Sequence, residues 1–395
     1  MEIKEYTLRD LLTIKNGKDY KHLDHGDVPV YGTGGIMTYV NEKLFSGESI
    51  LLPRKGTLNN IIYVEGDLWT VDTMYWTIVD STKTYPKYLY LYLSLLDLSS
   101  KDSGSTLPSM TFDSYYSIPV KLPGLRIQMQ IADKIFTITN KILNNYNISK
   151  ELESMAKTLY DYWFLQFEFP NKEGKPYKTS GGKMVWNDEF KREIPEGWEV
   201  NKISECLTHI NTGLNPRDHF VLNDGNIKYV TVKNLTTTGD LDFSGCDTIS
   251  DSTKKLINKR SMISPGDILF ASIAPLGRCF IIRENPYDWE INESVFSIRP
   301  NEKVSSEYLY QYFMSEYFVK KAEHSSTGSV FAGIRISTLN DIDIVIPPKA
   351  ITDKFTNKLI NIYKLKYRKS KENQELTSLR DFLLPMLMNG QVTFK

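Results

Sequence analysis

The feature that most constrains the fold of this chain is an internal repeat. The segment from Gly104 to Pro123 aligns without a gap on the segment from Gly328 to Pro347. In both copies a Gly-Ser turn leads into an alternating strand that a proline ends. The two copies lie 224 residues apart in a chain of 395 residues, since 328 minus 104 is 224. A repeat at this distance predicts two units of the same fold.

The repeat extends upstream at a nearly constant offset. Three segments align on their second copies in the same order: 69–72 on 289–292, 76–78 on 296–298, and 88–90 on 308–310. Further back, 47–51 faces 266–270, and the openings from Tyr6 to Gly17 and from Lys202 to Gly213 match loosely. Several matches in one order at a nearly constant offset are hard to obtain by chance, so we interpret the chain as a duplication.

A long helical pattern follows each copy. Apolar residues recur at helical spacing first at Ile131, Ile135, Ile138 and Ile142, then at Leu152, Met155, Leu159 and Tyr162, with a polar interruption at Asn144, Asn145 and Asn147 between them. The second pattern contains Ile351, Phe355, Leu359 and Ile362, a basic run from Lys364 to Lys371, and Leu376, Leu379 and Leu383. An apolar stripe must be covered. We therefore expect the two helices to pack on each other as an antiparallel coiled coil.

The predicted fold class is α+β, with two β-rich domains related by pseudo-twofold symmetry and separated by the two long helices. We expect five segments: a domain over residues 1–122, a helix over 123–167, a connector over 168–197, a domain over 198–346, and a helix with a tail over 347–395. Within the domains, shorter helices are expected near 86–98 and 305–322, and the closing helix is expected to end near Pro385.

Composition narrows the function classes. Lys plus Arg and Asp plus Glu both number 48, so no overall basic field attracts nucleic acid. Three cysteines without CxxC spacing favour reduced thiols, and five scattered histidines argue against a metal site. The first residues are too charged for a signal peptide, and the longest apolar stretch, Tyr88 to Leu96, is too short to span a bilayer. These features predict a soluble, cytoplasmic protein without membrane contact.

Motifs with possible chemistry favour ordinary structural roles. Asn285-Pro286-Tyr287 lacks one proline of the loop that amino-methyltransferases use, and a turn between strands explains it. Gly32-Thr33-Gly34-Gly35 lacks the downstream lysine of a phosphate-binding loop, so we expect a flexible turn beside a DNA-facing surface. Asp72 and Asp80, with Lys83 or Lys87, do not form a nuclease pattern. We therefore predict no catalytic residue, no cofactor and no metal.

Polar side chains in loops that follow strands recur in both copies. Arg, Asn, Ser and Thr are the residue types that read base edges and contact phosphates, and ordinary solvation of a loop is the competing interpretation. The basic run from Lys364 to Lys371 has the same two interpretations. The candidate DNA-binding residues are Arg54, Lys55, Thr57, Asn59, Asn60, Ser105, Thr106, Lys233, Asn234, Ser272, Arg278, Ser326, Thr327, Ser329 and Arg335.

These features together resemble the specificity subunit of Type I restriction-modification systems, over essentially the whole chain. The resemblance rests on the domain-closing strands at Ser117 to Pro123 and Asp343 to Pro348, the helix start Gln128 to Ala132, and the bridge Ile194-Pro195-Glu196-Gly197-Trp198. The second helix departs from the family pattern, because Lys349 to Asp353 lacks the glutamine usual near that point.

The resemblance implies a non-catalytic subunit with two target recognition domains, each of which reads one half of a bipartite sequence in double-stranded DNA. It also implies as partners two methyltransferase subunits and two motor-nuclease restriction subunits. Zero net charge is unusual for an isolated DNA binder, unless partner subunits contribute positive charge. The alternatives are a scaffold whose duplicated modules bind proteins and a self-contained restriction or methylation enzyme, and the missing cofactor and metal motifs disfavour the enzyme.

Overall fold

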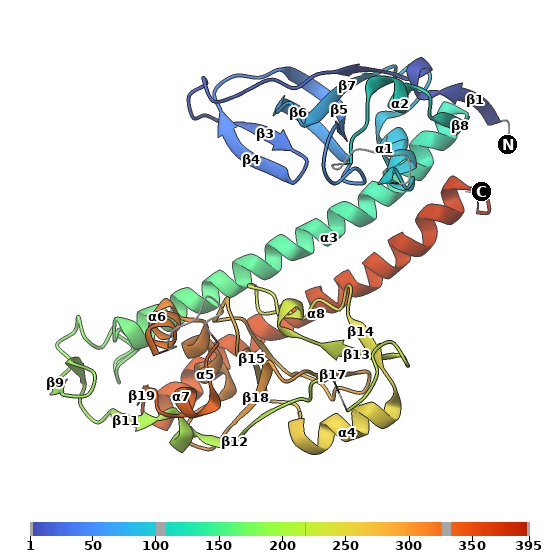
Figure 1. The fold of residues 1–395 in the computed structure, drawn as a ribbon. Helices are drawn as coiled ribbons and strands as arrows, with labels where there is room; N and C mark the ends of the chain where they lie inside the picture. Colours follow the sequence, from blue (N-terminus) through green and yellow to red (C-terminus); the bar gives the residue numbers. More distant parts are fainter. Residues whose placement is uncertain (1–2, 100–107, 218, 326–332, 393–395) are drawn as a thin grey trace. The chain divides into compact units, whose positions relative to one another are not determined.

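The computed structural model describes residues 3–99, 108–217, 219–325 and 333–392. The chain forms two compact units: unit 1 comprises residues 1–144 and 372–395, and unit 2 comprises residues 145–371. Two long helices, α3 (Leu125–Tyr160) and α8 (Lys349–Met388), each contribute one part to unit 1 and the other part to unit 2 (Figure 1). In the described part of the chain, no helix has both the length and the apolar character needed to span a membrane.

Unit 1 is built around a six-stranded sheet with the order β2-β7-β5-β6-β3-β4. Its strands are β2 (Leu12–Lys15), β3 (Val28–Gly32), β4 (Gly35–Val40), β5 (Phe45–Pro53), β6 (Ile62–Thr70) and β7 (Met74–Val79). All neighbours are antiparallel except β3 and β6, which are parallel. A separate pair joins β1 (Ile3–Thr7) to β8 (Pro119–Pro123), so the start of the unit is held against its closing strand.

The strand β5, in the middle of this sheet, is buried on both of its faces. Successive side chains of a strand point to opposite sides. Ile50 and Leu52 therefore pack into the core beneath helix α1 (Pro86–Ser94), whereas Leu51 packs on the other face with Met74. The short helix α2 (Phe112–Tyr116) lies directly before β8.

Unit 2 divides the equivalent strands between two sheets. A four-stranded sheet has the order β12 (Leu207–Thr212), β18 (Val295–Pro300), β15 (Ile268–Ala271) and β16 (Cys279–Ile281). A three-stranded sheet has the order β14 (Asp247–Ile249), β13 (Ile227–Val230) and β17 (Trp289–Ile291). As in unit 1, the opening strand β11 (Glu199–Lys202) pairs with the closing strand β19 (Asp343–Ile346).

The strand pairings confirm the predicted duplication. The order β2-β7-β5-β6 recurs as β12-β18-β15-β16, and the parallel pair β3 and β6 recurs as β13 and β17. Trp69 and Trp289, which the repeat aligns on each other, occupy the corresponding positions in these parallel pairs. A glycine is needed at one place in both units: a Cβ atom on Gly17 would lie 2.0 Å from the oxygen of Val71, and one on Gly213 would lie 1.7 Å from the oxygen of Ile291.

Unit 2 also contains elements without a counterpart in the described residues of unit 1. These are α4 (Asp251–Ser261) and α6 (Glu316–Ser325). The expectation of one helix over 305–322 was wrong, because the chain breaks between α5 (Ser306–Met314) and α6. Ser315 is extended there, with ψ of 143°, and its hydroxyl accepts a hydrogen bond from the N–H of Phe318. Helix α7 (Ile336–Asn340) precedes β19 as α2 precedes β8.

The connector between the copies packs into unit 2. It forms a hairpin of β9 (Met184–Asn187) and β10 (Arg192–Pro195). Its apolar residues Phe169 and Ile194, and Trp198 directly after it, are buried in the same core as Phe164. Burial of these side chains explains why a segment rich in turn residues is ordered against the domain.

The long helices are antiparallel in each unit, as predicted. In unit 1, Lys141 on α3 forms an ion pair of 3.4 Å with Glu372 on α8. In unit 2, the rings of Tyr160 and Trp163 pack on Phe355, with centroids 6.3 and 5.8 Å away. Ile131 of α3 shares the core of unit 1 with Leu387 of α8, and Glu153 of α3 pairs with Lys366 of α8 in unit 2, so within each unit residue numbers rise along one helix as they fall along the other.

The predicted apolar stripe of α3 is correct in its first half and only partly correct in its second, where Leu159 packs against the core of unit 2 and two other predicted residues do not. Met155 is 58% exposed and Tyr162 is 38% exposed, whereas Ala156 and Tyr160 are buried. The buried face continues through Asn145, Ser149 and Glu153, which are polar. The asparagine segment is therefore not an interruption of the packed face, because the helix keeps its period there with polar side chains. On α8, Leu379 is likewise exposed.

The end of α8 also differs from the prediction. The helix continues past Pro385 to Met388, and the oxygen of Pro385 accepts a hydrogen bond from the N–H of Asn389. This last turn buries Leu387, which is 3% exposed, in the core of unit 1 beside Ile131. The apolar contact outweighs the tendency of proline to end a helix.

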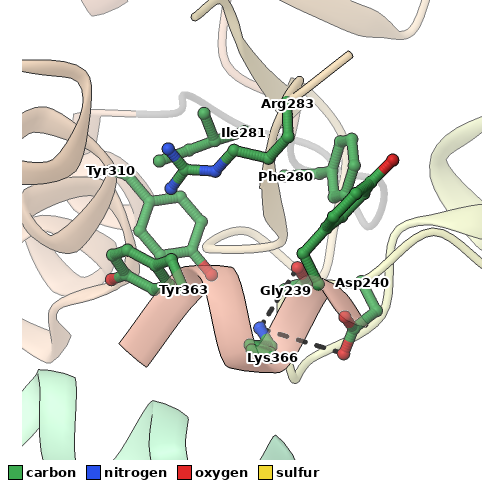
Figure 2. Close-up of a pocket in the computed structure, with 9 residues that line it drawn as sticks. Gly239, Asp240, Phe280, Ile281, Arg283, Tyr310, Tyr363 and Lys366 are labelled. Carbon is green, nitrogen blue, oxygen red and sulfur yellow. Dashed lines mark hydrogen bonds and ion pairs between the residues drawn. The ribbon is translucent and has the colours of Figure 1, made fainter. Parts of the chain in front are cut away.

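The basic run on α8 contains a buried lysine. Lys366 is 4% exposed, so neither a solvated face nor a phosphate contact describes it. Its Nζ lies 2.7 Å from Oε2 of Glu153, and it donates to the carbonyl of Thr238. Figure 2 shows its two other partners, the carbonyl of Gly239 and the carboxylate of Asp240, whose Oδ2 lies 3.8 Å away. Burial raises the pKa of Asp240, although the Lys366 ammonium opposes this shift.

The second oxygen of Glu153 completes a buried network in unit 2. Oε1 accepts hydrogen bonds from Gln311 Nε2 at 3.1 Å and from the Tyr310 hydroxyl at 3.3 Å, and Gln311 also donates to the hydroxyl of Tyr363. A Cβ atom on Gly239 would lie 1.9 Å from the Tyr310 hydroxyl, so only glycine fits where this loop meets α5. The network therefore joins α3, α5, α8 and the loop at 238–240.

Lys366→Met should destabilise unit 2 by ~3–5 kcal/mol, because it leaves the carboxylate of Glu153 buried without a cation. The double variant Glu153→Met with Lys366→Met should lose less stability than Lys366→Met alone, since the unpaired carboxylate of Glu153 no longer remains buried. Urea unfolding measures the free energy of unfolding of both variants. Lys364→Met, at an exposed position on the same helix, is the control and should change stability by less than ~0.5 kcal/mol. Equal effects of Lys366→Met and Lys364→Met would contradict this assignment.

Leu387→Ala should destabilise unit 1 by ~2–5 kcal/mol, because it opens a cavity in a core that the last turn of α8 completes. Leu379→Ala is the matched control, since Leu379 lies on the same helix and is 46% exposed. Thermal unfolding of both variants provides the comparison. The packing described here is incorrect if the two substitutions have the same effect.

Candidate nucleic-acid interface

Each unit has an edge where the loop after one central strand meets the turn before another. In unit 1, Arg54 follows β5, and its N–H donates to the oxygen of Thr73 at 2.8 Å. In unit 2, Ser272 follows the equivalent strand β15, and its N–H donates to the oxygen of Ser294 at 3.0 Å. The duplication therefore builds a similar backbone contact in both units, shifted by one residue relative to the aligned repeat and with different side chains at each copy.

A third segment joins this edge in both units. Lys55 pairs with Ser109 in a β-bridge, and Ile273 pairs with Gly333 in the equivalent bridge. The predicted residues Ser105, Thr106, Ser326, Thr327 and Ser329 lie outside the described residues. Ser109 and Gly333 follow these residues in the sequence, and they pair with the loops after β5 and β15.

The predicted residues of unit 1 divide into two groups. Lys55 and Thr57 are exposed, and Arg54 is half-buried with its Nη1 donating to the oxygen of Asp72 at 3.3 Å. Asn59 accepts hydrogen bonds from the N–H groups of Leu98 and Ser99, and Asn60 donates to the oxygen of Thr33 at 2.5 Å. The two asparagines thus hold the loop in place and Arg54 also contacts the domain, while Lys55 and Thr57 are exposed at the start of the loop.

The predicted residues of unit 2 divide in the same way. Lys233 and Arg335 are exposed. Asn234 is 2% exposed, and its side chain accepts from Thr231 and donates to the oxygen of Asp242 at 2.9 Å. Ser272 is 6% exposed, and its hydroxyl donates to the oxygen of Ser294 at 2.8 Å. Both of these side chains are committed to the domain itself.

Arg278 is half-buried, and its Nε is enclosed without a hydrogen-bond partner. Its backbone oxygen accepts from the N–H of Ala271, which places the residue across from the end of β15. The guanidinium is always charged, so this position keeps a cation beside the loop that starts at Ser272.

A hollow of about 660 Å³ lies at the edge of unit 1. It is bordered by the turn between β3 and β4, by the turn after β6, and by the segment around Tyr20. Sequence reasoning places Gly32 to Gly35 beside a DNA-facing surface but does not identify Tyr20, Lys21 or Met37. The available signal was Ile36-Met37, two successive apolar residues directly after a glycine-rich turn.

The other motifs have structural explanations. Asn285-Pro286-Tyr287 forms the turn between β16 and β17, and Lys254 donates to the oxygen of Pro286 at 2.7 Å, so the turn interpretation is confirmed. The carboxylate of Asp80 accepts from Thr82 within its own turn. The three cysteines are free thiols. Among the described residues, no three His, Cys, Asp or Glu side chains come together as a metal site.

Comparisons with known proteins agree with this architecture. The family model described as "Type I restriction modification DNA specificity domain" matches residues 1–154 and 195–378. The MjaIX specificity subunit of Methanocaldococcus jannaschii, a Type I restriction enzyme subunit, is 24% identical, and the alignment covers 99% of this chain and 89% of the relative. The HindI specificity subunit of Haemophilus influenzae is 24% identical, with 84% and 83% covered.

A solved structure has the same fold. The crystal structure of the S subunit of a Type I restriction-modification system from M. genitalium superposes with a TM-score of 0.62 at 13% identity, and the match covers 98% of this chain and 96% of that chain. The family model matches two stretches that together make up most of the chain, one in each copy of the repeat. The chain therefore belongs to the family of Type I restriction-modification DNA specificity subunits.

Proposed function

We propose that this chain reads a bipartite, asymmetric sequence in double-stranded DNA, with one half-site for each recognition domain. The observation that carries the proposal is the edge that the duplication builds twice. The backbone contacts after β5 and β15 are similar, and the β-bridges to the third segment place Lys55 in one unit where Ile273 stands in the other. Two similar scaffolds with different side chains are suited to two different half-sites.

The chemistry of the exposed side chains supports DNA reading. Arginine can donate two hydrogen bonds to guanine, threonine can contact the thymine methyl group, and lysine can pair with a phosphate. Arg54, Lys55 and Thr57 provide these groups at the edge of unit 1, and Arg335 and Lys233 provide cations in unit 2. Asn60, Asn234 and Ser272 support the loops from behind, and the exposed Asn59 binds the N–H groups of Leu98 and Ser99.

The balance of charge supports shared binding. Phosphate neutralisation supplies much of the affinity of DNA-binding proteins, and this chain has equal numbers of acidic and basic residues. We infer that two methyltransferase subunits bind this chain, enclose the DNA and contribute positive charge, and that two motor-nuclease subunits join this complex. The chain would act in the cytoplasm, where bacterial or archaeal DNA is accessible, as a non-catalytic subunit.

Exchange of residues 1–122 for the corresponding domain of a related subunit should change one half of the methylated motif and leave the other half unchanged. The reason is that the sheets and recognition edge of each copy are built from its own residues. Methylome sequencing of cells that express the exchanged subunit with its methyltransferase partner gives the result. A motif altered in both halves would refute independent reading.

Arg335→Ala should weaken binding of the specific DNA by the methyltransferase complex by roughly tenfold to a hundredfold, which is the range for loss of a good base contact. The loss should depend on the base pairs of one half-site only. Lys354→Ala is the control, because Lys354 is exposed on α8 in the same unit. If Arg335→Ala weakens the binding of random DNA as strongly as the binding of the specific site, Arg335 contacts phosphate and does not read bases.

A further inference from the structure

The ribbon formed by β3 and β4 exposes apolar side chains on unit 1. β4 pairs with β3 and is the edge strand of the six-stranded sheet (Figure 1). Within it, Ile36, Met37 and Tyr39 are 51%, 57% and 43% exposed. Proteins normally protect an edge strand with charges, a proline or a covering segment. An exposed apolar group of this kind marks a binding surface.

A β-bulge presents Met37. Val30 pairs with Thr38 and Tyr31 pairs with Ile36, so Met37 is the additional residue on β4. Bulges redirect a side chain and occur next to functional sites. A Cβ atom on Gly32 would lie 2.6 Å from Sδ of Met37, so the glycine provides the space in which the methionine crosses the ribbon.

The ribbon is continuous with the candidate interface. Asn60, in the loop after β5, donates to the oxygen of Thr33 at the tip of the ribbon. Met37 and Thr33 border the same hollow as Lys21 and Asp72. The exposed cation Lys21 borders the hollow together with the carboxylates of Asp19 and Asp72, and the exposed Lys55 lies in the adjoining loop after β5. The two lysines can each pair with a phosphate, and the ribbon adjoins the loop that carries the candidate DNA-binding residues.

The equivalent ribbon of unit 2 is different. Its outer strand β14 consists of Asp247, Thr248 and Ile249; the first two are half-buried and Ile249 is fully buried. No exposed apolar side chain occurs in this strand. The apolar ribbon is therefore a property of unit 1, and it should serve a feature of only one half-site.

We propose that the β3–β4 ribbon enters the major groove of the half-site that unit 1 reads, and that Met37 contacts the C5-methyl group of a thymine there. The major groove is ~12 Å wide and accepts a two-stranded ribbon, and the thymine methyl is the apolar group that it presents. The polar tip and the flanking lysines face groups that can accept hydrogen bonds, while Met37 supplies an apolar contact. This inference rests on the proposed DNA-reading function.

The test uses the chain in complex with its methyltransferase partner and a DNA duplex that carries the methylated motif. Each thymine of the half-site assigned to unit 1 is replaced in turn by deoxyuridine, which lacks only the methyl group. At one position this replacement should weaken binding about fourfold, which corresponds to the ~0.8 kcal/mol for burying one such carbon at ~1.4 kcal/mol per tenfold.

Met37→Ala should abolish the difference in binding between the thymine and deoxyuridine duplexes at that position. Binding should not change at the other positions. Gly32→Ala should reduce the difference as well, because its methyl group displaces the side chain of Met37. Met155→Ala is the matched control, since Met155 is 58% exposed and lies on α3, and it should retain the full difference. Thermal unfolding is used to check that all three variants are folded.

Several outcomes would overturn this inference. They are a half-site without thymine on either strand, equal binding of every deoxyuridine duplex by the unmodified chain, or an undiminished difference in Met37→Ala. If Met37→Ala binds its methyltransferase partner more weakly, and the complex that still forms discriminates thymine from deoxyuridine as before, the ribbon binds a protein. In all these cases specific DNA binding by the complex would leave the proposed function intact, whereas a complex that binds random DNA equally well would refute the function itself.

Discussion

Each unit of this protein completes its core with side chains from both long helices, and the remaining structure depends on this constraint. In unit 1 the core contains Ile131 and Ile135 of α3 and Leu387 of α8. In unit 2 it contains Tyr160 of α3 and Phe355 and Leu359 of α8. A helix with an apolar face cannot remain solvated, so each β-rich domain and its two helix segments form one hydrophobic core.

Polar contacts specify how the helices pair within unit 2. Apolar packing alone permits several registers between two helices, because one leucine can replace another at little cost. The buried pair of Glu153 and Lys366 is satisfied in one register, with Gln311 and Tyr310 as further donors to the carboxylate. Lys366 also binds the carbonyls of Thr238 and Gly239, so the same pair positions a loop of the recognition domain.

Sequence reasoning found the large elements because their signals repeat. The nearly constant offset between the two copies identified equivalent domains, and the spacing of Ile131, Ile135 and Phe355 identified the helical faces. It failed at Met155 and Lys366, because it assigned apolar residues to the inside and charged residues to the outside, whereas the packed face near Glu153 is polar. It also treated Asn234 and Asn60 as free side chains. Their hydrogen bonds to Asp242 and Thr33 join residues whose proximity only the folded chain reveals.

The recognition edges have a consequence for how such a protein can change. The contact between the loop after β5 and the turn before β7 is made by the N–H of Arg54, and that after β15 by the N–H of Ser272. Every residue except proline carries this donor, so a substitution at Arg54 or Ser272 keeps the backbone hydrogen bond and removes only the bond from the side chain, to Asp72 or to Ser294. If the edge reads DNA as we propose, substitutions at the exposed positions Lys55 and Thr57 alter the preferred bases while this backbone contact is kept. A lineage would then acquire a new DNA specificity through single mutations.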